Sequence, residues 1–170
     1  MRVLIVSDTH GCVDARICAL AQACDRVVHG GDVGDAAVLD ALGGAVSAVR
    51  GNNDTAAKWP AAQQQRLQQL PLQAELELPG GRLVVVHGDA WPARGRHAAL
   101  RRAFATARAV VYGHSHRLAI DSDALPWILN PGAGGRARTH GGPSCLLLQA
   151  AADAWQVEAR QFGGGFRDTL

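Results

Sequence analysis

Short apolar runs that each end in a tight polar cluster are the feature that most constrains this chain. The run from Val110 to Tyr112 stops at Gly113 and is followed by two histidines, His114 and His116. The same arrangement occurs four times upstream, in the clusters Asp8-Thr9-His10-Gly11, Gly31-Asp32-Val33-Gly34-Asp35, Gly51-Asn52-Asn53-Asp54 and His87-Gly88-Asp89. A buried strand that ends in a polar loop explains each unit, so we expect these side chains at the carboxyl ends of strands, where open α/β sheets bind ligands.

The stretches between the clusters predict alternating strands and helices, and therefore a parallel sheet, in the first half of the chain. Apolar positions at helical spacing predict a helix after the first cluster, a second helix that Asp35 caps, a surface helix between Lys58 and Leu70, and an Arg-rich helix around Leu100. The second half is richer in strands. Strands are expected at residues 3–6, 26–29, 46–49, 74–78, 83–86, 109–112, 127–129, 145–149 and 155–159.

Length and composition limit the classes of protein to which the chain can belong. The 170 residues fit one domain, which we place at 1–162, with a frayed tail at 163–170. A net charge of +2 gives no strong nucleic-acid signal, and no apolar run is long enough for a membrane span. The first residues read as a core strand and not as a secretion signal, so we expect a cytoplasmic protein. The four cysteines then read as small buried hydrophobes.

Seven polar residues of the clusters carry the oxygen and nitrogen donors that bind divalent metals: Asp8, His10, Asp32, Asn52, His87, His114 and His116. Seven donors are too many for one ion and suit two ions that share a carboxylate. Asp32 is the natural bridge, because a Gly-rich turn can leave both of its oxygens free. Two ions about 3.5–4 Å apart can activate a water and clamp a phosphate. These donors fit Mn, Fe, Ni, Co or Zn, and we take Mn as the first choice.

The five clusters resemble, in order, the D-x-H, GD-x-x-D, GN-H-D/E, lone H and G-H-x-H blocks of the calcineurin-like metallophosphoesterases. Arg50 before the third block and Asn130-Pro131-Gly132 near the end are similar to the small YfcE-like phosphodiesterase branch. The resemblance implies a four-layer α/β/β/α sandwich of two mixed sheets flanked by helices. It also implies a phosphodiesterase that hydrolyses P–O bonds by attack of a metal-activated water or hydroxide.

Carried over by position, the resemblance implies two ligand sets that share Asp32. One metal would be held by Asp8, His10, Asp32 and His116, and the other by Asp32, Asn52, His87 and His114. The residues expected at the catalytic centre are Asp32, Asn52, Asn53 and Asp54. Two positions depart from the family pattern. Asn53 replaces a catalytic His, which leaves the source of the leaving-group proton open, and Asp89 replaces the second His of a His-Gly-His, which bears on substrate choice.

Several other polar residues can be explained by simple structural roles. We expect Asp35 to be a helix cap or to support the ligands, His29 to lie in the core, and His97 and His140 to lie at the surface. Asn130 more often makes an Asx-turn before a proline than it lines a site. We expect the arginines from Arg94 to Arg108 to form a solvent-exposed surface, and attraction of a phosphate is the less favoured alternative. The same two interpretations apply to Arg136 and Arg138.

Three functions fit these observations to different degrees. A dinuclear phosphodiesterase acting on a small phosphodiester or nucleotide-like substrate is favoured, because no proposed ligand is replaced. A catalytically weak scaffold on the same fold, like the retromer-subunit branch of this superfamily, is the alternative. A nuclease is weaker still, since the chain has no basic stripe with interleaved aromatics. The natural substrate and the oligomeric state stay open, and a homo-oligomer is compatible with the sequence.

Overall fold

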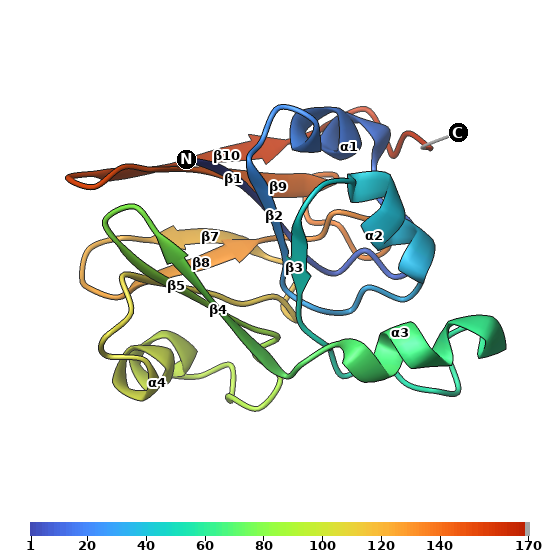
Figure 1. Cartoon of the computed structure of the whole chain (residues 1–170), viewed down its shortest axis with the longest axis horizontal. Coiled ribbons are helices and arrows are strands. Elements are labelled where there is room, and N and C mark those ends of the chain that lie inside the picture. Colours follow the sequence, from blue (N-terminus) through green and yellow to red (C-terminus); the bar gives the residue numbers. More distant parts are fainter. Residues whose placement is uncertain (169–170) are drawn as a thin grey trace.

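The computed structural model describes residues 1–168, which form two five-stranded mixed sheets and four α-helices (Figure 1). The first sheet has the order β10-β9-β1-β2-β3 and the second β4-β5-β6-β8-β7. In the first sheet β1, β2 and β3 are parallel, and in the second β5, β6 and β8 are parallel. The carboxyl ends of these parallel strands are where the polar clusters begin.

The elements follow the predicted order with few differences. The strands are β1 Arg2–Val6, β2 Arg26–His29, β3 Val46–Ala48, β4 Gln73–Leu78, β5 Gly81–Val86, β6 Ala109–Val111, β7 Leu118–Asp121, β8 Trp127–Pro131, β9 Ser144–Ala150 and β10 Trp155–Gln161. The helices are α1 Ala15–Ala21, α2 Ala36–Leu42, α3 Gln64–Gln69 and α4 Arg96–Ala103, with a 3-10 turn, η1 Ala61–Gln63, before α3. Strand β7 is new to the structure, and the surface helix expected from Lys58 begins several residues later.

Alternation along the strands builds the four layers. In β1, Val3 and Ile5 face the second sheet and pack with residues such as Val85 and Leu129, while Leu4 and Val6 face the opposite way, toward α1 and α2. A third apolar cluster lies between the second sheet and α4, around Leu100. In Figure 1, α1 and α2 cover the outer face of the first sheet and α4 covers that of the second. The expected α/β/β/α sandwich is therefore confirmed.

Helix ends follow their local sequence. Asp35 caps α2 as expected, because its Oδ1 accepts a hydrogen bond from the Ala37 N–H at 2.8 Å. Asp14 caps α1 in the same way, through the Arg16 N–H at 3.0 Å. Helix α2 ends at Gly43, whose φ of 64° suits glycine.

The end of the described chain is hydrogen-bonded to the start of α1. Arg167 donates its N–H to the buried Asp14 carboxylate at 2.8 Å, and the Arg167 carbonyl accepts from the Ala15 N–H at 3.0 Å. Arg16 also donates to the carbonyls of Gly163 and Gly165. Residues 163–168 are thus held against the start of α1, while the rest of the predicted tail, 169–170, lies outside the described residues.

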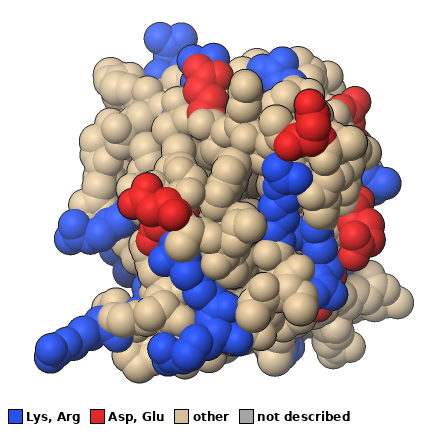
Figure 2. Space-filling view, turned by 90° about the vertical axis from the view of Figure 1, so that its left-hand side faces the viewer, with Lys and Arg blue, Asp and Glu red and all other residues tan. Residues whose placement is uncertain are grey.

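Charged side chains of both signs occur on the surface. Figure 2 views the side on which the β9–β10 turn lies in Figure 1, and both basic and acidic side chains occur there among other residues. Several of the basic groups on the molecule are paired, such as Arg82 with Glu75 and Arg101 with Asp121. Within residues 1–168, no helix is both long and apolar enough to cross a lipid bilayer.

Candidate metal centre

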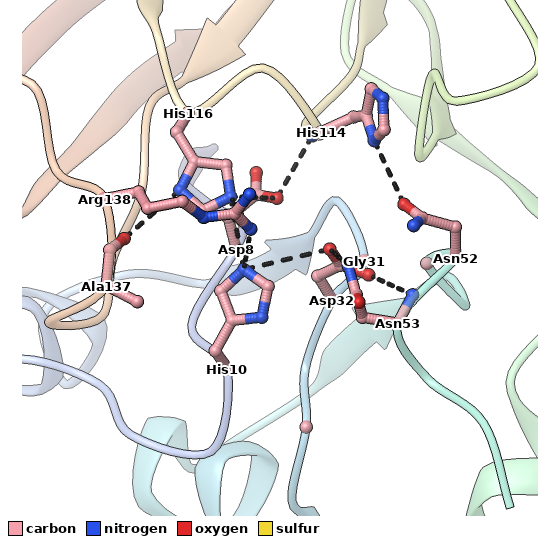
Figure 3. Close-up of polar contacts among 12 residues, drawn as sticks. Asp8, His10, Gly31, Asp32, Asn52, Asn53, His114, His116, Ala137 and Arg138 are labelled. Carbon is pink, nitrogen blue, oxygen red and sulfur yellow. Dashed lines mark hydrogen bonds and ion pairs between the residues drawn. The ribbon is translucent and has the colours of Figure 1, made fainter. Parts of the chain in front are cut away.

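The structure brings all seven predicted donors to one edge, between the two sheets, and Figure 3 labels each of them except His87. Asp8 and His10 follow β1, Asp32 follows β2, and Asn52 follows β3 in the first sheet. His87 directly follows β5, and His114 and His116 follow β6 in the second sheet. Backbone hydrogen bonds join these loops, including Asp8 N–H to the Gly31 carbonyl and Gly113 N–H to the His87 carbonyl, both at 3.0 Å. The chain folds this way because parallel strands share one carboxyl edge.

Asp8, His10 and His116 form the first candidate metal-binding group. The Nε2 atoms of His10 and His116 are 3.2 Å apart, and His116 Nε2 lies 3.3 Å from Asp8 Oδ1. His116 Nδ1 faces the Ala137 carbonyl at 3.2 Å. A donor bond from Nδ1 to that carbonyl leaves the Nε2 lone pair directed into the cluster, which is the tautomer that a metal requires.

Asp8, Asp32 and His87 form the second candidate group. His87 Nδ1 lies 2.8 Å from the Gly30 carbonyl, which fixes the ring and turns Nε2 toward Asp32 Oδ1 at 3.5 Å. Asn52 Oδ1 lies 3.0 Å from both His87 Nε2 and His114 Nδ1. His114 belongs to neither carboxylate group and reaches the second one through Asn52.

Asp32 lies between the two groups. Its Oδ1 faces His87, and its Oδ2 lies 3.8 Å from His10 Nε2. The carboxylate is 1% exposed, so both oxygens point into protein and not into solvent. Gly51 makes this position available, because a Cβ there would lie 2.2 Å from Asp32 Oδ1. One buried carboxylate therefore presents a different oxygen to each half of the centre.

Asn53 and Asp54 have roles that the sequence does not reveal. Asn53 donates its N–H to Asp32 Oδ1 at 2.8 Å and its side-chain Nδ2 to Oδ2 at 2.7 Å, while Lys58 contacts its Oδ1. Both oxygens of the proposed bridge are thus held by one residue. Asn53 orients Asp32 in this structure and does not face open solvent as a free amide.

Asp54, which was expected at the catalytic centre, is buried and hydrogen-bonded within the protein. Its buried carboxylate accepts four hydrogen bonds: from the N–H groups of Val33, Gly34 and Gly51 and from Trp59 Nε1, at 2.8–3.1 Å. Because an ionised carboxylate has about four acceptor positions, none is left for a metal or a substrate. Asp54 instead ties the loop after β2 to the loop after β3, and so positions Asp32 beside Asn52.

Burial and neighbouring charges set the protonation of the centre. Burial raises the pKa of Asp8 to about 7, although the Ser7 hydroxyl donates to it at 2.7 Å. Burial also acts to raise the pKa of Asp32, but the hydrogen bond and charge of His87 and the bonds from Asn53 outweigh it and hold that pKa well below its usual range. For His87, burial acts to lower the pKa, and Asp32 outweighs it and raises the pKa to about 9.

The histidines of the first group have lowered pKa values, in contrast to His87. Burial, followed by the charge of Arg138, lowers the pKa of His116 to about 4. Burial is also the main reason why the pKa of His10 is lowered, with Arg138 contributing. Both rings are therefore neutral near pH 7, and a neutral imidazole is the form that binds a metal.

These observations agree with bound divalent ions. The neutral imidazoles of the first group, a buried carboxyl whose pKa is raised by burial, and a shared carboxylate form a donor set of mixed oxygen and nitrogen. Cysteine contributes nothing to either group. The donors thus fit a catalytic type of site better than a structural thiolate site.

Backbone strain is concentrated at this centre. Among residues 1–168, the non-glycine residues with positive φ are Asp8, His10, Asp32, His114, His116 and Arg138. Their φ values of 50–63° lie in the left-handed region, which residues other than glycine enter at some cost. Five of the six are predicted metal ligands, and the sixth, Arg138, reaches the same cluster.

Arg138 is the functional candidate that the sequence did not single out. Its Nη2 lies 3.0 Å from His116 Nε2 and 3.3 Å from His10 Nε2, although it comes from the loop between β8 and β9 (Figure 3). Its neighbour Arg136 turns away and pairs with Asp168 at 3.0 Å. The Gly-rich loop after Asn130 was the only sequence signal, and it does not distinguish the two arginines.

Two cavities adjoin the second candidate group. One, of about 430 Å³, is lined by Asn52, Asp54 and the exposed Leu72, and the other, of about 290 Å³, is lined by His87 and Trp91. Arg50, Leu72 and Asp89 line both cavities. Asp89, the second departure from the family pattern, therefore lies beside the centre.

The remaining polar residues are placed as follows. His29 is buried, as expected, with Nε2 2.9 Å from the Thr9 hydroxyl. Asn130 makes the expected turn, accepting from the Gly132 N–H, and also donates to the Gly113 carbonyl and the Ser115 hydroxyl at the end of β6. His97 is partly exposed, and its ring bridges Asp121 at 2.7 Å and the Tyr112 hydroxyl at 3.0 Å.

Comparison with known proteins defines the class. The model of the calcineurin-like phosphoesterase superfamily domain matches residues 1–153. The chain therefore belongs to the calcineurin-like phosphoesterase superfamily. Among curated proteins, none matches the chain significantly.

Solved structures support the same fold. Vps29 of Entamoeba histolytica in complex with Zn²⁺ matches with a TM-score of 0.71 at 18% identity, over 94% of this chain and 98% of that chain. A protein described as a novel archaeal phosphodiesterase matches with a TM-score of 0.69 at 19% identity, over 94% of this chain and all of that one. An uncharacterised, predicted phosphoesterase of Streptococcus pneumoniae matches at 0.64 and 18% identity, over 94% and 97%. At these identities the likeness concerns the fold alone.

Proposed function

We propose that this protein is a dinuclear metal-dependent phosphodiesterase. The observation that carries the proposal is the position of Asp32, whose two buried oxygens face His87 on one side and His10 on the other. The family match and the archaeal phosphodiesterase of the same fold support it. In this proposal one ion is held by Asp8, His10, Asp32 and His116, and the other by Asp32, Asn52, His87 and His114. Manganese is the first choice, with Fe, Ni, Co or Zn as alternatives.

Two bound divalent ions would supply a nucleophilic water near neutral pH and neutralise charge on the phosphate. The chain's own residues do the positioning. Asn53 holds both oxygens of Asp32, and Asp54 holds the loops that carry Asp32 and Asn52. His87 is oriented by the Gly30 carbonyl and His116 by the Ala137 carbonyl. Such supporting contacts fix ligand direction, and their loss typically costs 10–100-fold in metal affinity or activity.

The cavities beside Asn52 and His87 suit one ester arm of a small substrate. Leu72 and Trp91 offer apolar contact, while Arg50 and Asp89 offer one charge of each sign. A nucleotide-like or similarly amphipathic arm fits this lining. A dianionic monoester is disfavoured near Asp89, which adds to the preference for diesters.

The test is a panel of phosphodiesters with protein reconstituted in Mn²⁺, compared with chelator-treated protein. Hydrolysis that requires the metal and is nearly abolished in Asp32→Asn is the expected result, since a neutral amide bridges two cations poorly. Circular dichroism should be unchanged, because the core strands do not depend on Asp32. Near-normal turnover in Asp32→Asn would show that the metal assignment is wrong, and no turnover across the panel would favour the scaffold alternative.

A further inference from the structure

Arg138 places a guanidinium directly over the two histidines of the first group. Nη2 lies within hydrogen-bonding distance of both Nε2 atoms, at 3.0 Å from His116 and 3.3 Å from His10. Arginine only donates, so the imidazole nitrogens that accept from it do so with their lone pairs. The same lone pairs are the ones that would bind a metal. The arginine is thus a cation beside the atoms that would bind a metal.

The path of the chain agrees with a specific role for this side chain. Arg138 is the one non-glycine residue with positive φ, within residues 1–168, that is not among the seven predicted ligands. Its φ of 53° directs the side chain back toward the strand tips. Among the ion pairs formed within residues 1–168 none involves Arg138, whereas the neighbouring Arg136 pairs with Asp168. An unpaired guanidinium is available for an anion.

A metal bound by His10 and His116 would use the lone pairs that now hold the guanidinium. The two cations would also repel each other at this distance. The arginine would then turn from the histidines, while its backbone stays fixed at the rim of the centre. The anion that the proposed function brings to that rim is a phosphate, whose oxygens match the planar fork of a guanidinium.

We propose that Arg138, at the rim of this centre beside His10 and His116, is a phosphate-binding residue. The proposal rests on the function proposed above and extends it to a residue outside the metal ligands. It assigns to Arg138 the non-bridging oxygens of the substrate phosphate.

The experiment measures phosphate binding apart from turnover. Inorganic phosphate is titrated calorimetrically into Mn²⁺-loaded wild type, Arg138→Ala, Arg138→Lys and Arg136→Ala, after metal analysis has confirmed equal loading. Arg136→Ala is the matched control, because it removes an arginine from the same loop that points elsewhere. Alanine and arginine have the same Cβ, so Arg138→Ala leaves the backbone strain unchanged. Mn²⁺ affinity is measured separately by electron paramagnetic resonance.

Loss of a charge-assisted contact predicts phosphate binding roughly 10- to 100-fold weaker in Arg138→Ala, a partial loss in Arg138→Lys, and no change in Arg136→Ala. Mn²⁺ should bind Arg138→Ala at least as tightly as wild type, because a competing cation is gone. Unchanged phosphate affinity in Arg138→Ala, no phosphate binding by loaded wild type, or a loss of Mn²⁺ affinity in Arg138→Ala would each overturn the inference. Phosphate binding through Arg138 without diester hydrolysis would refute the proposed function alone.

Discussion

At the scale of single residues, His29 shows how burial couples protonation to stability. Burial lowers its pKa to about 4, against 6.5 for an unperturbed histidine. The unfolded chain therefore binds a proton that the folded chain excludes between these pH values. The contribution of His29 to stability is fully present above pH 6.5 and is lost as the pH falls toward 4.

His29→Gln is expected to remove this dependence. Below pH 6.5, the free energy of unfolding of the wild type should fall by about 1.4 kcal/mol per pH unit more than that of the variant. Urea unfolding in chelator at several pH values between 4.5 and 7 measures the difference. Asp8, whose raised pKa has the opposite effect, is present in both proteins and cancels. Parallel pH profiles would show that His29 is protonated in the folded protein.

Asn53 leads to a prediction about substrate preference. General acid assistance is typically worth ~10²–10⁴-fold, and an amide cannot supply the proton that a poor leaving group needs. We expect the wild type to favour aryl phosphodiesters over matched monoesters in kcat/KM, and Asn53→His to gain on monoesters. Because Asn53 also holds Asp32, metal content must be compared in both proteins. Two outcomes would show that Asn53 does not set the substrate preference. The first is a wild type with a higher kcat/KM on the monoester, and the second is an Asn53→His protein that keeps its metals but has no higher kcat/KM on monoesters.

At the scale of elements, the start of α1 joins a helix cap to the tail. Asp14 accepts from the backbone and side chain of Arg16 and from the Arg167 N–H. Asp14→Ala should lose a cap, worth about 0.5–2 kcal/mol, together with the hydrogen bond that holds the Arg167 N–H. Asp35→Ala is the control, because Asp35 caps α2, a helix of equal length, without holding the tail. Urea unfolding and limited proteolysis within residues 163–168 report the two effects.

Equal losses in the two variants, with the tail still resistant to protease, would contradict this role of Asp14.

Elements that carry a regular pattern were predictable from sequence, and those set by distant partners were not. The strands that carry the ligands have unbroken apolar runs, so both the strands and the polar clusters after them could be placed. Strand β7 has a mostly half-exposed pattern and is defined by pairing with β8. The contacts of Asp54 and Arg138 could not be predicted, because most of their partners lie far along the chain and local sequence spacing does not show which loops meet in space.

At the scale of the whole molecule, the candidate centre joins the two sheets. Asp8, His10, Asp32 and Asn52 follow strands of the first sheet, whereas His87, His114 and His116 follow strands of the second. Any ion bound between them contacts both sheets and is released when either one unfolds. Metal binding should therefore stabilise the domain as a unit.

Metal removal is expected to lower the Tm. An ion at about 100 times its Kd contributes roughly 2.7 kcal/mol, which corresponds to about 5–10 °C for a chain of this size. Thermal unfolding followed by circular dichroism, with excess Mn²⁺ or with chelator, measures the shift. Asp32→Asn should show a much smaller one. A Tm that does not respond to Mn²⁺ would mean that no ion binds the folded state more tightly than the unfolded chain.

The residues around the centre that have left-handed backbone conformations lower stability but supply the donor atoms that the proposed chemistry needs. Glycine would occupy these backbone positions with less strain than the Asp, His and Arg residues found there. A library of variants selected for heat resistance alone, in the presence of chelator, should therefore accumulate glycine at such positions and lose the donors. The reverse also holds: a protein kept for its metal chemistry retains local instability at the strand tips, and much of its tolerance to mutation must come from the apolar layers behind them.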